Sequence, residues 1–229
     1  MHKLFLATIL LVSSMSFSIA QSKKLTAFTA LKARGNVNIT LEPSKENKAD
    51  FTMIKGNAEK LSMEVNADGV LEIKLLSDNS MFNRSNGQAN VTLYFVELNQ
   101  IEATGGSQVN GTEYFDSKEM IINVSSVSTV NVRVNAAIYD LNSSSGASLT
   151  LTGKGKKASF AASSGASINA VALELEQAEA KSSSGSNITL NATESVDAKA
   201  SSGSSVRYKG NPSKVKSDAK TSGGSVSKI

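Results

Sequence analysis

A unit of about nineteen residues recurs seven times along this 229-residue chain, and it strongly limits the folds open to the chain. Ser-Ser-Gly-Ala-Ser occurs at 144–148 and again at 163–167, with shorter or degenerate copies before and after. If the third residue of each copy is the anchor, the anchors are 106, 127, 146, 165, 185, 203 and 223. Their spacings are 21, 19, 19, 20, 18 and 20 residues. Periods of this length are typical of solenoids and other repeat arrays.

Three columns of residue types keep a fixed distance from the anchor. Two residues before it, every copy has a hydroxyl: Thr104, Ser125, Ser144, Ser163, Ser183, Ser201 and Thr221. Three residues after it, every copy has a branched aliphatic side chain: Val109, Val130, Leu149, Ile168, Ile188, Val206 and Val226. Five residues before it, the pattern weakens towards the C-terminus: Ile101, Ile122, Leu141, Phe160, Ala180, Ala198 and Asp218. We expect the aliphatic column to face inwards and the hydroxyl column to run along a corner.

The pattern around each anchor predicts an all-β fold, a right-handed parallel β-helix with coils of about 19 residues. Small or apolar residues alternate with polar ones, which is the period of a strand. Glycine at the anchor permits a bend that a Cβ atom would resist. A leucine-rich repeat would need a leucine framework and a helical segment, which are absent, and a propeller blade is about twice as long.

The N-terminal part is also strand-rich but lacks the Ser-Ser-Gly motif. Two alternating runs within 61–75 flank a turn at 66–69, which predicts an antiparallel hairpin. Residues 77–89 are polar and aperiodic, as in a loop. We interpret 24–99 as a cap on the β-helix of 100–229, because a repeat stack needs a different terminal unit. Residues 21–229 would then form one domain.

The first twenty residues have the pattern of a secretory signal peptide. Lys3 precedes an apolar run, and small residues precede a cleavage point between Ala20 and Gln21. The run is shorter than the roughly 20 apolar residues that span a bilayer. No second apolar stretch follows, so we expect no transmembrane helix after cleavage. Export would place the chain in the periplasm, at the cell surface or in the medium.

The order of several short motifs resembles a bacterial family, the putative auto-transporter adhesin head GIN domain, common in the Bacteroidetes. The motifs are a Gly-x-Val-x-Ile-x-Leu strand at 35–41, Gly56-Asn57, Asp-Gly-x-Leu-x-Ile at 68–73, Val-Thr-Leu-Tyr-Phe at 91–95, the Ser-Gly units, and Val-Arg-Tyr-Lys-Gly-Asn-Pro at 206–212. The resemblance covers nearly all of 21–229 and implies a β-helix with an adhesin-like role. It supplies no catalytic residues. Because only three residues follow Val226, we expect no C-terminal membrane barrel of the autotransporter kind.

The composition disfavours most catalysis. The chain has no cysteine, and its one histidine, His2, lies in the expected signal peptide. Without these residues it lacks thiolate chemistry, the commonest metal ligand and the commonest general base. We therefore predict no catalytic residue, no metal and no cofactor. The carboxylates Glu174, Glu176 and Glu179, with Glu194 and Asp197 one coil on, leave open a carbohydrate-active enzyme, although a solvated surface explains them more simply.

Charge is segregated near the C-terminus. Residues 171–198 carry a net charge of −4, and residues 207–229 carry +5. Stacked coils would place these segments side by side, where weak ion pairs between coils are natural. The basic segment predicts a patch for an anionic ligand, made of Arg207, Lys209, Lys214, Lys216 and Lys220. The overall balance of +4 gives no indication of nucleic-acid binding.

The sequence thus predicts an exported, non-enzymatic, adhesin-like module. Its partner would be a polysaccharide or a cell-surface protein. Two alternatives stay open: a glycosidase or lyase on the same scaffold, and a structural envelope or matrix component whose copies associate through an open last coil. An ice-binding surface is disfavoured, because the repeated hydroxyls are mostly serine and flank a bend. We expect these hydroxyls to form structural hydrogen bonds between successive corners instead.

Overall fold

The computed structural model describes residues 21–76, 87–219 and 222–229. In these residues the regular structure is β-strand, apart from one 3₁₀ turn, η1 (Ala58–Lys60). The expected signal peptide with Ala20, most of the predicted loop, and Lys220 lie outside the described residues. The strands are β1 (Gln21–Lys24), β2 (Ala30–Arg34), β3 (Val37–Pro43), β4 (Lys48–Lys55), β5 (Leu61–Val65), β6 (Val70–Leu75), β7 (Gln88–Phe95), β8 (Gln100–Thr104), β9 (Gln108–Val124), β10 (Thr129–Ser143), β11 (Ser148–Ala162), β12 (Ser167–Ser182), β13 (Asn187–Ala200), β14 (Ser205–Lys209), β15 (Lys214–Asp218) and β16 (Ser225–Lys228).

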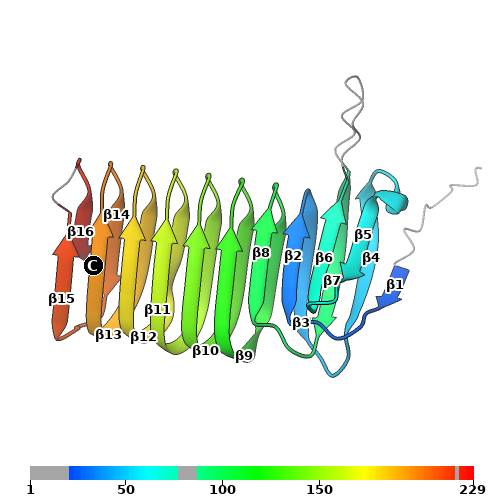
Figure 1. Cartoon of the computed structure of the whole chain (residues 1–229), viewed down its shortest axis with the longest axis horizontal. Helices are drawn as coiled ribbons and strands as arrows, with labels where there is room; N and C mark the ends of the chain where they lie inside the picture. Colours follow the sequence, from blue (N-terminus) through cyan, green and yellow to red (C-terminus); the bar gives the residue numbers. More distant parts are fainter. Residues whose placement is uncertain (1–20, 77–86, 220–221) are drawn as a thin grey trace, which may run out of the picture.

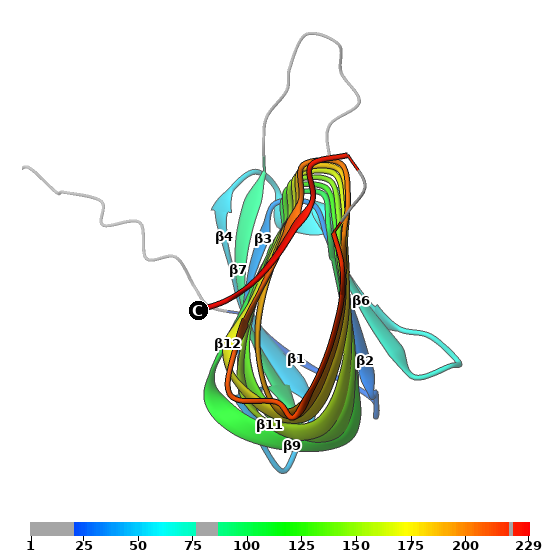
Figure 2. The ribbon, with the colours of Figure 1, turned by 90° about the vertical axis from the view of Figure 1, so that its left-hand side faces the viewer.

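The strands form a parallel β-solenoid of about six turns, as the repeat predicted. Each long strand from β9 to β13 crosses one wide side of the solenoid, rounds a bend and returns along the other side (Figures 1 and 2). The first half of β9 pairs with β3 and its second half with β8, so both sides are parallel sheets. A tight turn at the opposite corner leads to the next rung. The right-handed sense of the coil stays a prediction.

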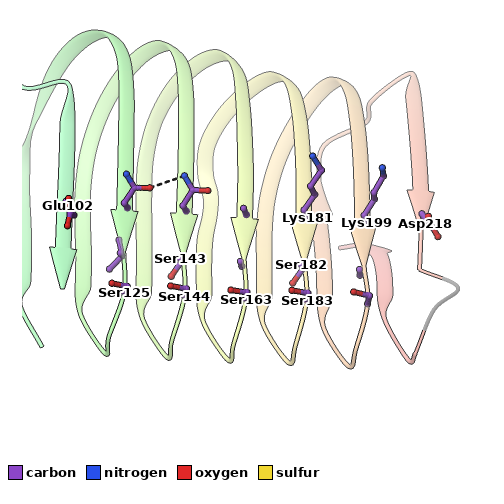
Figure 3. Close-up of a pocket in the computed structure, with 17 residues that line it drawn as sticks. Glu102, Ser125, Ser143, Ser144, Ser163, Lys181, Ser182, Ser183, Lys199 and Asp218 are labelled. Atoms are coloured by element: carbon purple, nitrogen blue, oxygen red, sulfur yellow. Dashed lines mark hydrogen bonds between the residues drawn. The ribbon is translucent and has the colours of Figure 1, made fainter. Parts of the chain in front are cut away.

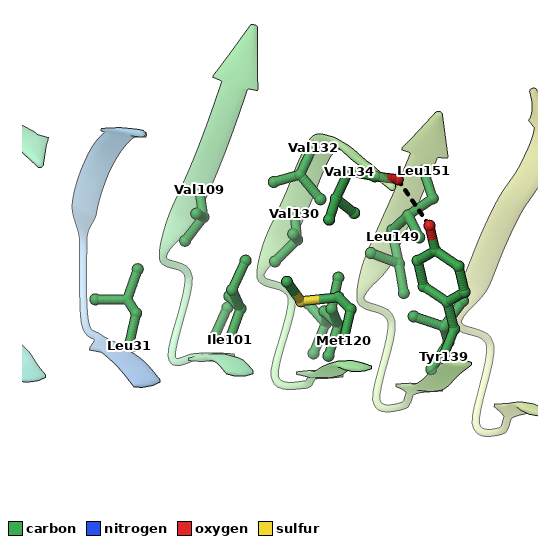
Figure 4. Close-up of a cluster of buried hydrophobic side chains, with 14 of the residues drawn as sticks. Leu31, Ile101, Val109, Met120, Val130, Val132, Val134, Tyr139, Leu149 and Leu151 are labelled. Carbon is green, nitrogen blue, oxygen red and sulfur yellow. Dashed lines mark hydrogen bonds between the residues drawn. The ribbon is translucent and has the colours of Figure 1, made fainter. Parts of the chain in front are cut away.

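The aliphatic column faces inwards and stacks in register, as predicted. Val130 pairs with Val109 on one side and with Leu149 on the other, and the series continues to Val226. From Val109 to Val206 these side chains are at most 1% exposed, whereas Val226 in the last rung is half-buried. The column therefore forms the centre of a continuous apolar core between the two sheets (Figure 4).

The last copy of the repeat departs from the predicted alignment. The sequence alignment placed Asp218 five residues before the anchor, in line with Ala198. In the structure Ser217 pairs with Ala198 at that level, and Asp218 pairs with Lys199 on the outside. The prediction was wrong by one residue, because the last rung has one more residue before its anchor. A carboxylate between the sheets would be unpaired and costly, and the actual register leaves it in solvent.

The Ser-Ser-Gly motif forms a tight turn with two residues at positive φ. In the turn of 144–147, Ser145 has φ 53° and Gly146 has φ 69°, and the Ala147 amide donates to the Ser144 carbonyl at 3.2 Å. These are the features of a type I′ turn. The Gly146 amide also donates to the Ser164 carbonyl of the next turn at 3.0 Å. The same bond recurs along the corner, so the ladder between rungs continues through the turns.

One turn lacks the glycine, and this leads to a stability prediction. Val127 stands at the anchor with φ 61° and is 74% exposed. A β-branched residue is strained there, because the left-handed region costs an L-residue about 1–2 kcal/mol. We expect Val127→Gly to raise the free energy of unfolding by about 1 kcal/mol, measured by urea denaturation. The matched change Val215→Gly, in strand β15 without positive φ, should instead lower it; two losses of equal size would contradict the assignment of strain.

The rounded bend holds a buried tyrosine. The Tyr139 side chain is 1% exposed, and its hydroxyl accepts a hydrogen bond from the Ala136 amide at 2.9 Å. The hydroxyl can donate a hydrogen bond to the carbonyl oxygen of Val134 at 2.7 Å (Figure 4) or to that of Lys154 at 2.9 Å. The ring lies against Gly155 of the next rung, whose lack of a side chain leaves room for it. One side chain thus satisfies backbone groups where the bend interrupts the ladder.

The N-terminal strands are stacked out of sequence order. β2 lies between β6 and β8, and β3 lies between β7 and β9, all in parallel. Beyond them, β5 pairs antiparallel with β6, which confirms the predicted hairpin, and β4 pairs antiparallel with β7. Parallel stacking therefore crosses the predicted boundary at 99/100, and β1, β4 and β5 form the outer cover of this end (Figure 1).

Candidate functional site

The two wide sides of the solenoid differ in chemistry. One side, which we call the amide face, consists of β7, β3, the first halves of β9 to β13, β14 and β16. Two outward rows run along it, set by the strand pairing: Asn90, Asn38, Gln108, Thr129, Ser148, Ser167, Asn187 and Ser205, and beside them Thr92, Thr40, Asn110, Asn131, Thr150, Asn169 and Thr189. These two rows are uncharged until Arg207 in β14.

The other side, the charged face, consists of β6, β2, β8, the second halves of β9 to β13, and β15. One outward row along it is Glu72, Lys32, Glu102, Asn123, Asn142, Ala161, Lys181, Lys199 and Asp218. At its N-terminal end, Lys32 and Glu102 form an ion pair at 2.9 Å. In the middle, three successive rungs carry no charge in this row. The charges therefore lie at the two ends of the row.

A groove runs along the charged face beside the tight turns, and we call it the serine groove (Figure 3). Its volume is about 670 Å³. One wall is the outward row from Glu102 to Asp218, and the other is formed by the hydroxyl column that the sequence had placed at a corner: Ser125, Ser144, Ser163, Ser183 and Ser201. Ala161 takes the place of a longer side chain in the first wall, and the groove crosses several rungs. The repeat thus builds one continuous groove.

Most of the groove hydroxyls have no hydrogen-bond partner among the described residues. Ser125 Oγ donates to Thr104 Oγ1 at 3.2 Å. Within the described residues, no hydrogen bond involves the hydroxyls of Ser144, Ser163, Ser183 and Ser201, and all four residues are half-buried. We expected this column to serve structural bonds between corners. That role falls mainly to buried serines one residue after the anchor, such as Ser186, whose Oγ donates to the Ala162 carbonyl at 2.8 Å.

The carboxylates of the groove do not form a catalytic pair. Glu102 and Asp218 are six rungs apart in the row, or about 29 Å at the usual strand spacing of about 4.8 Å. Glycosidases hold their two carboxylates within about 5–10 Å of each other. Elsewhere, Glu174 and Glu176 are exposed, and Lys154 lies 3.7 Å from Glu174. In the part of the chain that the structure describes, no three acidic, histidine or cysteine residues gather as a metal site.

An ion pair beside the groove shifts the pKa values of its two members. Glu179 Oε1 and Lys181 Nζ are 2.8 Å apart on β12. The hydrogen bond and charge of Lys181 lower the pKa of Glu179, and the same contact raises the pKa of Lys181. A catalytic acid needs its pKa raised, so the direction at Glu179 is the opposite of what acid catalysis requires. The pair instead keeps both groups charged at neutral pH.

The structure distributes the predicted basic patch over both sides. Arg207 and Lys209 belong to β14 on the amide face, whereas Lys214 and Lys216 belong to β15 on the charged face. Lys216 Nζ lies 3.2 Å from Asp197 Oδ2, an ion pair between rungs of the kind expected from the charge segregation. Lys220 lies outside the described residues. Gln21, the residue after the predicted cleavage point, begins β1 and is exposed.

We did not predict from the sequence the outward row of the groove that carries Ala161, Lys181 and Lys199. The signal was available four residues before the anchor, where the series begins with Glu102, passes through two asparagines and an alanine, and ends with two lysines. Residues of an outward row can differ from rung to rung, so the repeat was visible only in the hydroxyl and aliphatic columns. The outward row of the groove changes from glutamate to lysine along the axis, and this change sets the charge of the groove.

The fold and its surfaces define a parallel β-solenoid with long polar faces. The family model of the putative auto-transporter adhesin, head GIN domain, matches residues 27–212, and the chain belongs to that family. No curated protein matches the sequence. No helix in the described residues is both long and apolar enough for a membrane span.

Solved structures share the fold across nearly the whole chain. A putative adhesin from Bacteroides fragilis has 22% identity and a TM-score of 0.81, with 92% of this chain and 96% of that chain covered. A putative adhesin from Parabacteroides distasonis has 16% identity and a TM-score of 0.71, with the same coverage. A putative lipid binding protein from Parabacteroides distasonis has 20% identity and a TM-score of 0.68, again with 92% and 96% covered.

Proposed function

We propose that the chain is an exported, non-enzymatic, adhesin-like binding module. The observation that carries the proposal is the serine groove, with a row of half-buried hydroxyls that have no hydrogen-bond partner in the part of the chain that the structure describes. Such hydroxyls can donate to and accept from a ligand without breaking any bond of the fold. The family's name and the names of the related solved structures support a role in surface contact.

The proposed route is export through the signal peptide of residues 1–20, with cleavage between Ala20 and Gln21. Residues 21–229 would then act as one domain in the periplasm, at the cell surface or in the medium. The proposed partner is a polysaccharide or a cell-surface protein, and nucleic acid is not a proposed partner. The basic residues Lys214 and Lys216 would add a secondary contact for anions. No cofactor is part of the proposal.

A glycan array on the purified exported chain, after fractionation of the producing cells, tests this function. We expect the chain in an exported fraction and retention of one class of glycan. We also expect no release of reducing or unsaturated ends when the bound glycan is incubated with the chain. Product release would favour the carbohydrate-active enzyme. A cytoplasmic chain, or binding to no glycan and to no cell surface, would contradict the adhesin-like role.

A further inference from the structure

We propose that the serine groove holds an extended acidic glycan parallel to the solenoid axis, with its carboxylates at Lys181 and Lys199. This inference rests on the proposed function and adds the class of ligand and its orientation. The sugar hydroxyls would lie over the uncharged rungs of Asn123, Asn142 and Ala161. The groove is the site because its length, its hydroxyls without partners among the described residues and its two adjacent lysines coincide (Figure 3).

The length of the groove favours a chain rather than a compact ligand. From Ser125 to Ser201 the hydroxyl column crosses four steps between rungs, or about 19 Å at about 4.8 Å per step. The lining residues come from successive rungs in the same two rows, so each step offers nearly the same contact. A ligand that repeats along its own length can use such a site more fully than a single compact molecule.

The hydrogen-bonding groups of the groove match a polyhydroxylated ligand. Ser144, Ser163, Ser183 and Ser201 each offer a hydroxyl that can both donate and accept. In the opposite wall, Asn142 Nδ2 donates to Asn123 Oδ1 at 3.0 Å, which fixes the two amides side by side. The lining has no aromatic side chain, so a flat aromatic ligand would find no ring to stack on.

The charges of the groove locate the carboxylates of the ligand. Lys181 and Lys199 occupy adjacent rungs of the same row and are both exposed. Lys181 pairs with Glu179, whereas no ion pair within the described residues involves Lys199. Asp218 closes the row beyond Lys199, and Glu102 closes the other end, where Lys32 and Arg34 hold its carboxylate. An acidic sugar is therefore attracted to the rungs of Lys181 and Lys199 and repelled from the carboxylates at the two ends of the row.

The test compares an oligogalacturonate with its methyl-esterified form of the same length, which removes the charge and keeps the hydroxyls. We expect the acidic probe to bind more tightly, and salt to weaken only this preference. Lys181→Gln with Lys199→Gln should lower affinity for the acidic probe by about tenfold and leave the esterified probe almost unaffected, as expected for the loss of two exposed ion pairs. Isothermal titration calorimetry measures both.

Two tryptophan substitutions at outward positions of β11 show which face of the solenoid binds the ligand. Ala161→Trp fills the groove and should abolish binding of both probes, whereas Thr150→Trp, on the amide face of the same strand β11, should leave it intact. Ser144→Ala with Ser163→Ala removes hydroxyls without adding bulk and covers the case in which Ala161→Trp perturbs folding. We expect this pair to weaken binding by about tenfold or less, in line with two neutral hydrogen bonds.

The outcomes separate this inference from the function on which it rests. Loss of binding in Thr150→Trp with retention in Ala161→Trp would move the site to the amide face and overturn the groove. If neither probe binds but another glycan class is retained on the array, the acidic ligand is overturned and the adhesin-like role stands. If the chain binds no glycan and no cell surface, the acidic ligand and the adhesin-like role are both overturned.

Discussion

Replacing Gly155 by alanine is expected to lower the free energy of unfolding by about 3 kcal/mol, because the bend has no room for a Cβ atom. The added carbon would lie inside the contact distance of the Tyr139 ring and 2.6 Å from the Ala136 carbonyl oxygen. The backbone of Gly155 is not at positive φ, so the loss would come from packing alone. Urea denaturation of the two proteins measures the difference.

The control for this change is Gly111→Ala in β9. Gly111 is also a strand residue without positive φ, and a Cβ atom there would come no closer than 3.5 Å to Leu41. Alanine should therefore be neutral or should stabilise the protein by up to about 1 kcal/mol through a less flexible unfolded chain. If both substitutions lower the free energy of unfolding by a similar amount, the loss at Gly155 is not caused by the contact with Tyr139.

Tyr139 is expected to make the stability of the solenoid fall in alkaline solution. Burial raises the pKa of the Tyr139 hydroxyl from 10.0 to about 12. The folded chain keeps this proton while the unfolded chain releases it, so the contribution is complete below pH 10 and is lost between pH 10 and about 12. Two pKa units correspond to about 2–3 kcal/mol of stability. Denaturation across this range, with the absorbance of the phenolate as a second measure, follows the loss.

Tyr139→Phe separates this effect from the titration of other groups. At neutral pH the variant should be less stable by about 1–3 kcal/mol, because the Ala136 amide loses its acceptor inside the protein. As the pH rises from 10 to 12, the advantage of the tyrosine should shrink, since only the original chain has this proton to lose. A constant difference between the two proteins over this range would contradict the raised pKa of Tyr139.

The solenoid was predictable because its repeat has a physical cause. Each inward column must match the columns of the rungs on both sides, so Val109, Val130 and Leu149 share a size and a shape. The tight turn adds a second constraint through its backbone, which needs glycine after a residue that already has positive φ. The positive φ at the serine itself was not predicted, since Ser145 has no feature in the sequence that marks it.

The order of the rungs at the N-terminal end could not be read in the same way. The strand of 37–43 has an alternating pattern that would fit beside any parallel neighbour, and local sequence does not reveal that β3 lies between β7 and β9. The groove was missed for a related reason. Outward residues such as Ala161 and Lys199 need no match across rungs, and their meaning depends on which side of the solenoid they share.

The interleaving of β2 and β3 has a mechanical consequence. Residues 30–43 are bonded on both sides by segments that follow them in the chain. Drawing them out requires the sheet to break along two lines at once. At the other end, within the described residues, β15 is bonded only to β13 and β16 only to β14. A pulling force is therefore expected to unfold the solenoid from the last rung, one coil at a time, and to separate the interleaved strands β2 and β3 last.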